Sequence, residues 1–494
     1  MDSTLPTHEA IHEAYQGGEE AVQRVFAAVI VQVEHLASHV QERHEVIHPL
    51  RDQLEKKSRN RSKPSSSDGV KKPRTRSLRT PGQRSTGGQP GHSGQTLPPV
   101  EHPDRVKGHQ GDVCQTCQRS VQEVEEERRE NRRVFDIPAL HLEVTEHQGV
   151  VNVCPQCGTV NRATVPSDVS QPAQYGPNVK AHAAYLTNYH YLSLERTAHF
   201  FEDGFGHRVS EGVSVNANVD GTAKGMPSND AVKQRLIDAA VVDFDESGLR
   251  VEGKGQWRHV ASTPELTYYG VHEKRGQTAM DAIGILPEFP GTAVPDHWKP
   301  YFTYTECDHS LCNAHHVREL QFVTEQYEQP WAENMDPLLR DLQKDVKHPR
   351  LSSESDHLEA EKLRRYDARY EEILEEGFRA NPPPVEDDQP PTARGKRKQS
   401  PPKNLLDRLQ RYKTEGLRFM YDFRVPFDQN QGERDIRMVK GKQKVSGSFR
   451  TKTGAAQCCR IRGSISTGRK HGVNVLEALK RAFEDTPFLP DTSD

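Results

Sequence analysis

The sequence predicts a multidomain protein of the α+β class, and three observations lead to that prediction. A chain of 494 residues is too long for one hydrophobic core and favours about three or four domains. With 33% hydrophobic and 28% charged residues, 35 Gly and 33 Pro, its composition is typical of folded modules joined by polar connectors. One central block has the pattern of three strands, a helix and a fourth strand, whereas the flanking segments have helical periodicity.

Hydropathy and charge narrow the class of protein. No stretch approaches the roughly 20 apolar residues that span a bilayer, and the N-terminus lacks the order of a signal peptide. We therefore expect a cytoplasmic protein with no membrane partner. The formal net charge of −4 hides a local imbalance, because residues 51–100 hold 12 Lys or Arg against 3 Asp or Glu.

Residues 1–57 are expected to form a helical, leucine-zipper-like segment. Pro49 cannot donate a helical hydrogen bond, so we expect one helix at about residues 19–47 and a short second helix. The apolar residues are suited either to pairing with a second copy or to packing within their own domain, and both remain open. They follow the alternating steps of four and three of a heptad seam and are Phe26, Val29, Val33, Leu36, Val40, Ile47, Leu50 and Leu54.

Residues 58–100 lack apolar periodicity and are rich in Ser, Pro, Gly and Arg. This composition predicts a disordered basic linker. Because its cations can neutralise phosphates along any duplex, we expect non-specific contact with the DNA backbone.

Two Cys-x-x-Cys pairs define a module at residues 101–165. Cys114 and Cys117 form the first pair, and Cys154 and Cys157 form the second after 36 residues that include a strand-like run at 140–153. Each pair bends the chain so that both sulfurs face one ion, which predicts a tetrahedral four-thiolate zinc site. Four thiolates leave no open coordination position, so this zinc is expected to be structural.

Residues 166–238 are expected to form a helical DNA-binding region. Within residues 175–223, a helix, a turn marked by Gly and a second helix behind a Ser cap follow one another. This order fits a helix-turn-helix, although many helix pairs that never touch DNA share it.

The central block brings acidic residues to strand ends. The apolar run at 239–245 predicts a buried strand with Asp243 and Asp245 at its end, on one face. Further strands are expected at 256–262, 266–272 and 291–296, the last ending in Asp296, with a helix at 278–286 before it. This order is that of a ribonuclease-H-like core, which we assign to residues 239–316 and 426–480.

Glu433 lies in a strongly basic strip at residues 428–450. With Asp245 and Asp296 it could hold two divalent ions about 4 Å apart for phosphodiester chemistry. Alternatively, Glu433 pairs with the Arg one helical turn later, a contact worth roughly a few tenths of a kcal/mol. The candidate DNA-binding cations are Arg434, Arg437, Lys440, Lys442 and Lys444.

A helical insertion at residues 317–425 is expected, because the second and third acids are 137 residues apart, against 51 for the first and second. Just before it lie Cys312 and His315. They are either half of a second metal site, with Cys458 or Cys459, or packing and hydrogen-bonding groups near the active site. We favour the second reading.

Several motifs together identify a family. In chain order they are "SKPSSSDG" and "GGQPGHSGQTL" within 62–97, the two Cys pairs with "IP" at 137–138, "QYGP" at 174–177, "DES" at 245–247, "DHWKPY" at 296–301, "LCNAHHVREL" at 311–320 and "DQNQGER" at 428–434. Over nearly its whole length the chain resembles the transposases of the insertion sequence 66 family, bacterial enzymes of the Asp-Asp-Glu class. The resemblance implies that Asp245, rather than Asp243, is the first catalytic acid, with Asp296 and Glu433 as the second and third. The departures from the family pattern are Gln429 for Asn, Gly432 for Ala, and Val317 for the first Arg of a pair.

The resemblance also implies a function. It implies a DNA transposase that cuts at element ends and joins the freed 3′-hydroxyl to a target duplex, with two Mg²⁺ or Mn²⁺ ions beside the structural Zn²⁺. A homo-oligomeric synaptic complex, accessory proteins of the element and association with the nucleoid on DNA binding are expected with it. The alternatives are a structure-specific nuclease of the same fold, which cuts without joining, and a non-enzymatic zinc-containing DNA-binding regulator.

Overall fold

The computed structural model describes residues 7–54, 97, 100–109, 111–125, 127–352, 355–382 and 399–490. Within these ranges, helices α1 to α15 and two sheets form a mixed α+β structure, as predicted. The chain divides into two compact units, one of residues 1–70, 168–197 and 210–494, the other of residues 71–167 and 198–209. No helix in the described ranges has both the length and the apolar character needed to cross a membrane.

The N-terminal segment forms two helices, α1 His8–Gln16 and α2 Glu19–Leu54. α2 continues through Pro49, so the predicted break there is wrong. Proline removes one hydrogen bond, but its φ fits a helix, and the long flanking turns propagate across the gap. The predicted linker at 58–100 lies almost entirely outside the described residues. Four seam residues are more than half exposed within this chain: Phe26, Val33, Leu36 and Val40.

The module with the Cys pairs contains one short antiparallel pair, β1 Val151–Val153 and β2 Val160–Arg162. Of the strand-like run at 140–153, only the last three residues form a strand, β1. A strand needs a hydrogen-bonded partner, and the three residues of β2 can pair with no more than that.

Residues 166–238, all of them described, contain α3 Pro177–Asn188, α4 Leu194–Phe205, α5 Glu211–Lys224 and α6 Met226–Ile237. Gly206 ends α4 with a φ of 68°, which glycine adopts without strain. Ser210 occupies the N-cap position of α5, but its side chain makes no capping hydrogen bond. The predicted helix, turn and helix are present, and their role in DNA binding stays a prediction.

The second sheet has the strand order β5-β4-β3-β6-β7. β3 Val241–Val251, β4 Lys254–Ser262 and β5 Thr267–His272 are antiparallel neighbours, and β6 Thr292–Val294 runs parallel to β3. The predicted three strands, helix (α7 Gln277–Ile283) and fourth strand are confirmed. The two-residue β7 Asp308–His309, which pairs with β6, was too short to predict.

β3 is longer than predicted, so Asp245 lies within the strand and not at its end. Pairing with β6 stops at Asp243, whereas pairing with β4 continues to Val251. A two-residue turn with positive φ at Glu252 and Gly253 closes this hairpin and lets both strands extend past β6. Asp245 therefore lies just beyond the parallel pairing.

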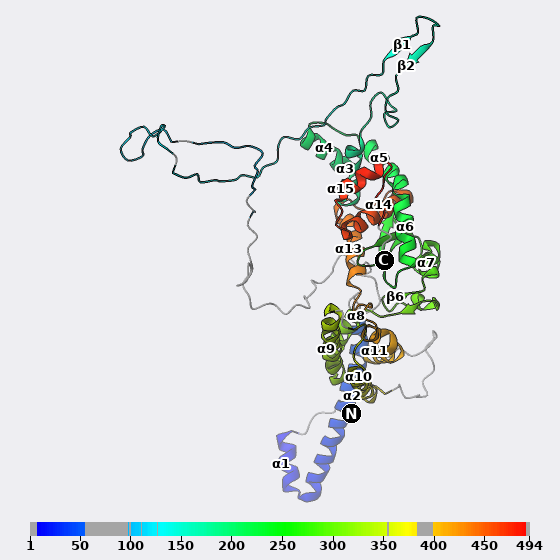
Figure 1. Cartoon of the computed structure of the whole chain (residues 1–494). Coiled ribbons are helices and arrows are strands. Elements are labelled where there is room, and N and C mark those ends of the chain that lie inside the picture. The colour runs from blue at the N-terminus through cyan, green and yellow to red at the C-terminus, as the bar shows by residue number, and fades with distance from the viewer. Residues whose placement is uncertain are drawn as a thin grey trace. The chain divides into compact units, whose positions relative to one another are not determined.

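Helices cover both faces of this sheet (Figure 1). Val242 and Phe244 of β3 belong to a hydrophobic cluster with residues of α6 and α7. Val260 of β4 and Tyr269 of β5 belong to another, with residues of α13 Asn430–Val445 and α14 Lys452–Lys470. Because successive side chains of a strand alternate, the odd-numbered acids of β3 face α13. The C-terminal helix α15 Val475–Phe483 packs on α3, α5 and α14.

The expected insertion is helical and has its own hydrophobic core, which includes Trp331, Tyr370 and Leu406. Its first helix, α8 Asn313–Tyr327, begins before residue 317, so the predicted boundary falls inside a helix. α8 therefore extends from the side of the acids into the insertion. The other helices are α9 Pro330–Ser352, α10 Ala360–Ala380, α11 Pro401–Arg411 and α12 Lys413–Tyr421, and the short 3-10 helices η2 Leu286–Glu288 and η3 Lys299–Thr303 precede α8.

Gly291, directly before β6, tests how tightly β6 packs against β3. A Cβ at this position would lie 2.6 Å from the carbonyl oxygen of Ala239 and 2.7 Å from that of Ala240. We expect Gly291→Ala to lower the free energy of unfolding by about 1–3 kcal/mol, because backbone must move to accommodate it. Urea unfolding measures this, with Gly255→Ala in β4 as the control, since nothing lies within 4 Å of its Cβ position. Equal stability of the two variants would contradict the prediction.

Candidate active site

Glu433 lies in the first turn of α13, where its carboxylate meets three basic side chains. Arg437 donates to Glu433 Oε2 at 2.7 Å, so the ion pair offered as an alternative from the sequence is present. Arg318 Nη1 and His315 Nε2 lie 3.5 Å and 3.7 Å from Oε1. The sequence reasoning did not identify Arg318 as a partner, because it lies on α8, 115 residues earlier, and no local pattern reports such a contact.

Asp245 and Asp296 join Glu433 in one electrostatic cluster. Burial raises the pKa of Asp245 well above its usual value. Repulsion by Glu246, Asp296 and Glu433 raises it further. Burial, and then repulsion by Glu246, raises the pKa of Asp296 to about 7. The structure thus brings Asp296 and Glu433 close enough to Asp245 to raise its pKa.

A fourth carboxylate, Glu246, is buried beside them and was not predicted as a site residue. Its Oε2 accepts a hydrogen bond from the Tyr301 hydroxyl at 2.5 Å, and its Oε1 accepts one from Arg275 Nε at 2.8 Å. The Arg275 guanidinium lies 3.8 Å from the ring centroid of Trp298. An arginine held in this way neutralises one charge of the acidic cluster. The place of Glu246 in the family motif "DES" at 245–247 was the signal in the sequence.

Cys312 makes a hydrogen-bonding contact of the kind that we favoured, whereas the buried His315 Nδ1 has no hydrogen-bond partner among the described residues and the role of His315 stays a prediction. Cys312 Sγ accepts a hydrogen bond at 3.3 Å from the backbone N–H of the residue before α13. Cys458 and Cys459, the partners in the alternative metal site, instead contact the buried Arg258, whose Nε donates to Cys459 Sγ at 3.3 Å. These two thiols therefore pack between β4 and α14 and accept hydrogen bonds from Arg258.

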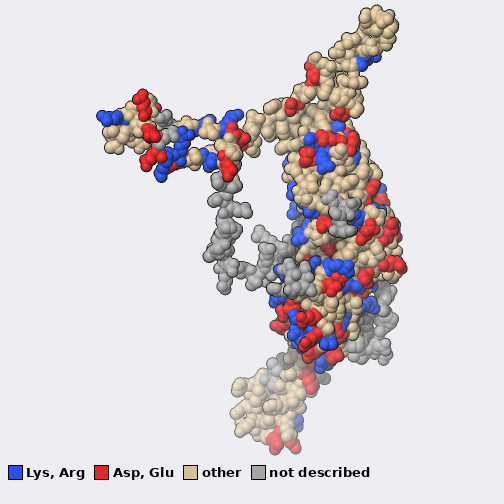
Figure 2. All heavy atoms as spheres, in the orientation of Figure 1, with Lys and Arg blue, Asp and Glu red and all other residues tan. Residues whose placement is uncertain are grey.

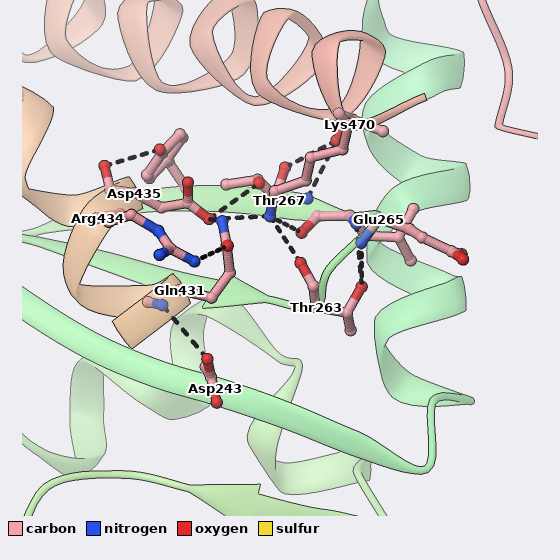
Figure 3. Close-up of polar contacts among 12 residues, drawn as sticks. Asp243, Thr263, Glu265, Thr267, Gln431, Arg434, Asp435 and Lys470 are labelled. Atoms are coloured by element: carbon pink, nitrogen blue, oxygen red, sulfur yellow. Dashed lines mark hydrogen bonds and ion pairs between the residues drawn. The ribbon is translucent and has the colours of Figure 1, made fainter. Parts of the chain in front are cut away.

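Asp435, the second acid of the basic strip, pairs with Lys470 of α14, and Figure 3 shows the two side chains pointing toward one another. Lys470 Nζ lies 2.9 Å from Asp435 Oδ2, and the side chains are only 11% and 13% exposed. Lys470 also donates to the carbonyls of Thr263 and Leu266, at 2.7 and 2.8 Å. Asp435 lies two residues after Glu433 on α13. The ion pair therefore connects this part of α13 to α14 and to the start of β5.

The five predicted DNA-contacting cations are not equivalent. Arg434, Arg437 and Lys444 are exposed, whereas Lys440 and Lys442 are half-buried. Burial lowers the pKa of Lys442, whose ammonium lies 4.4 Å from an aromatic ring centroid. Figure 2 shows positive and negative side chains intermingled on the visible face. Contact of these cations with DNA stays a prediction.

The two Cys pairs adopt the same turn. In residues 114–119 and 154–159 the N–H of the first Cys donates to the carbonyl five residues on, at 2.8 Å in each. Hydrogen bonds lower the pKa of Cys114, chiefly from the Cys117 backbone, and that of Cys157, chiefly from Thr159. Across the described ranges, no three His, Cys, Asp or Glu side chains are grouped as a metal site, so neither the four thiols nor the three acids form a ready-made ligand set.

Comparison with known proteins gives the class of the chain. Residues 172–457, more than half of the chain, match the family model described as "Transposase IS66 family". The protein therefore belongs to the IS66 transposase family, which supports a transposase function and DNA binding. Residues 4–98 match a second model, described as a family of unknown function. No curated protein matches the chain.

The raised pKa of Asp296 predicts a pH dependence of stability. Its pKa is about 7 in the folded chain against 3.8 ordinarily, so between these values the folded state holds more protons. The contribution of this group to stability is therefore lost as pH rises from about 4 to 7. Asp296→Asn should lose less thermal stability than wild type between pH 5 and 8, measured by melting temperature. Glu361→Gln, on the exposed face of α10, should follow the wild type; an identical profile for Asp296→Asn would contradict the assignment.

Proposed function

We propose that this chain is a DNA transposase of the Asp-Asp-Glu class, with a ribonuclease-H-like core. It would cleave DNA at the element ends and transfer the 3′-hydroxyl to a target duplex. The observation that carries the proposal is the electrostatic coupling of Asp245 to Asp296 and Glu433, which lie 51 and 188 positions further along the sequence. Carboxylates gathered from such distant positions are typical of a functional site.

The chemistry of the three acids fits divalent cations. Carboxylate oxygens are the ligands that Mg²⁺ and Mn²⁺ prefer. Burial, and then repulsion by Glu246, raises the pKa values of Asp245 and Asp296, so a bound divalent cation would favour their charged forms. When bound, two such ions would stabilise charge on the attacking and leaving oxygens of the phosphodiester.

The surrounding residues would orient the acids and the DNA. Arg318 and Arg437 would hold the Glu433 carboxylate in position. Arg434, exposed beside Glu433, would bind phosphate oxygens through its planar guanidinium. The contact between Glu246 and Arg275 would keep the region between β3 and β6 rigid.

Assembly and DNA contacts complete the proposal. The exposed seam of α2 would pair copies of the chain in a synaptic complex. The basic segment at 58–100 and the helices of 166–238 would add DNA contacts, and accessory proteins of the element are further candidate partners.

Substitution of Glu433 tests the proposal. Glu433→Gln keeps the size of the side chain but removes the charge, so Mg²⁺-dependent cleavage of an element-end duplex should fall by about 10²–10³-fold. Binding to the duplex should survive, because a carboxylate facing phosphate is gone. Asp245→Asn and Asp296→Asn should behave alike, and combining two changes should add little. Labelled-strand gels measure cleavage, with Glu361→Gln as the control.

The same assay separates the alternatives. Wild-type protein that cuts but never joins a 3′-end to a second duplex would be a nuclease. Wild-type protein that binds DNA without Mg²⁺- or Mn²⁺-dependent cleavage would be a regulator. Full activity of Glu433→Gln would show that Glu433 is no metal ligand, and the ion pair with Arg437 would then be the better account of this residue.

The Cys module is proposed to bind one structural zinc. The turns that begin at Cys114 and Cys154 match one another, and lowered pKa values favour the thiolates that Zn²⁺ requires. Metal analysis of protein purified without chelators should find about one zinc per chain. Cys154→Ser should lose it, whereas Cys307→Ser, outside both pairs, should keep it. Zinc-free wild-type protein would refute the assignment.

A further inference from the structure

The start of α13 is attached to neighbouring elements by three contacts whose residues the proposed chemistry does not use. The Gln429 side-chain amide donates to the carbonyl of Phe244 in β3. The Gln429 backbone N–H donates to Cys312 Sγ at the start of α8, at 3.3 Å. In the first turn of α13, the Gly432 N–H donates to Asp243 Oδ2, also at 3.3 Å, and Figure 3 shows Asp243 directly beside this turn.

The space around Gly432 is filled by the same residues. A Cβ on Gly432 would lie 3.2 Å from Asp243 Cβ, which is tighter than ordinary contact. It would also lie 3.5 Å from Gln429 Cγ and 3.7 Å from Gln429 Nε2. Gln429 is 1% exposed and Asp243 is 7% exposed, so neither side chain can yield freely into solvent. The missing Cβ therefore permits the close approach of α13 to β3.

This contact sets a distance within the site. Asp243 and Asp245 are two residues apart on one face of β3, and Gly432 directly precedes Glu433 on α13. Any shift of Gly432 away from Asp243 therefore shifts Glu433 relative to Asp245. A misplacement of about 1 Å in such a site can cost about 10²-fold in rate.

We propose that Gln429, Gly432 and Asp243 form a single packing unit, the α13 anchor, in which Asp243 is a positioning residue for Glu433. The extra methylene of Gln429, relative to Asn, occupies space next to the Cβ that Gly432 lacks, relative to Ala. The long side chain at 429 and the missing Cβ at 432 therefore fill one contact together, so their sizes compensate each other. The positioning role rests on the proposed function, whereas the packing unit does not.

A double-mutant cycle tests the packing unit without any activity measurement. Gly432→Ala and Gln429→Asn should each lower the melting temperature, the first by crowding Asp243 and the second by leaving a gap. The double variant should be more stable than the sum of the two losses predicts. Gly441→Ala in the same helix is the matched control, because its Cβ would meet Tyr191 at an ordinary 3.7 Å. Additive losses, or a Gly432→Ala variant as stable as Gly441→Ala, would overturn the packing unit.

If Gly432→Ala alone fails to fold, the double variant still decides. Recovery of folding in the double variant supports compensation, and continued failure overturns it. Wild-type protein without cleavage activity would refute the proposed function. The stability cycle would still test the α13 anchor, because it measures melting temperature and not activity.

Asp243 separates positioning from catalysis. Asp243→Asn retains an oxygen that can accept from the Gly432 N–H, so Mg²⁺-dependent cleavage should stay within about threefold of wild type, a tolerance of roughly one weakened hydrogen bond. Asp243→Ala removes the acceptor and should lower kcat about 10²-fold at unchanged DNA affinity. Asp245→Asn, which also keeps the size of the side chain, should instead fall by about 10²–10³-fold in the same assay. Equal loss in Asp243→Asn and Asp243→Ala, or no loss in either, would overturn the positioning role.

Discussion

The buried ion pair between Asp435 and Lys470 is the contact on which the placement of the site depends. Lys470 uses its three donors on Asp435 and on two carbonyls that precede β5, so one ammonium joins α13, α14 and the sheet. Breaking a buried pair of this kind typically costs about 3–5 kcal/mol, because the remaining charge stays buried and unpaired. α13 returns to the sheet only after the helical insertion, and this junction determines where it docks. The contact of Asp435 with Lys470 therefore also positions Glu433, two residues earlier on α13.

Charge is neutralised unevenly around the acids. Glu246 and Glu433 each have an arginine nitrogen within 2.8 Å, whereas the pKa values of Asp245 and Asp296 are raised. Cations of the protein thus hold Glu246 and Glu433 in position, whereas burial and neighbouring carboxylates disfavour the charged forms of Asp245 and Asp296. The proposed divalent cations would stabilise those charged forms. Pairing with cations also explains why acids occur in a basic strip, since Glu433 and Asp435 each meet specific cations there.

Local patterns predicted much of the fold because they reflect local physics. Alternating and apolar runs identified β3, β4, β5 and β6, and the acids on β3 and just after β6, without knowledge of the packing. The misses also have local causes. Pro49 was expected to break α2, but one absent hydrogen bond does not outweigh the turns on either side. The run at 140–153 alternates like a strand but mostly lacks a partner to pair with, and β3 continues past Asp245 because β4 extends its ladder.

The sequence by itself determined the order of the core strands, the positions of the acidic residues near them and the basic strip, because strand alternation, helix periodicity and residue chemistry are properties of neighbouring residues. Only the tertiary structure decided which cation meets which acid. Arg318 and Lys470 reach α13 from other helices, and Arg275 reaches Glu246 from beyond the end of β5. The same holds for Gly432, whose missing Cβ matters only because β3 lies 3.2 Å from its place. Such contacts join residues 29 to 189 positions apart, and they depend on how helices pack on the sheet, which no local periodicity records.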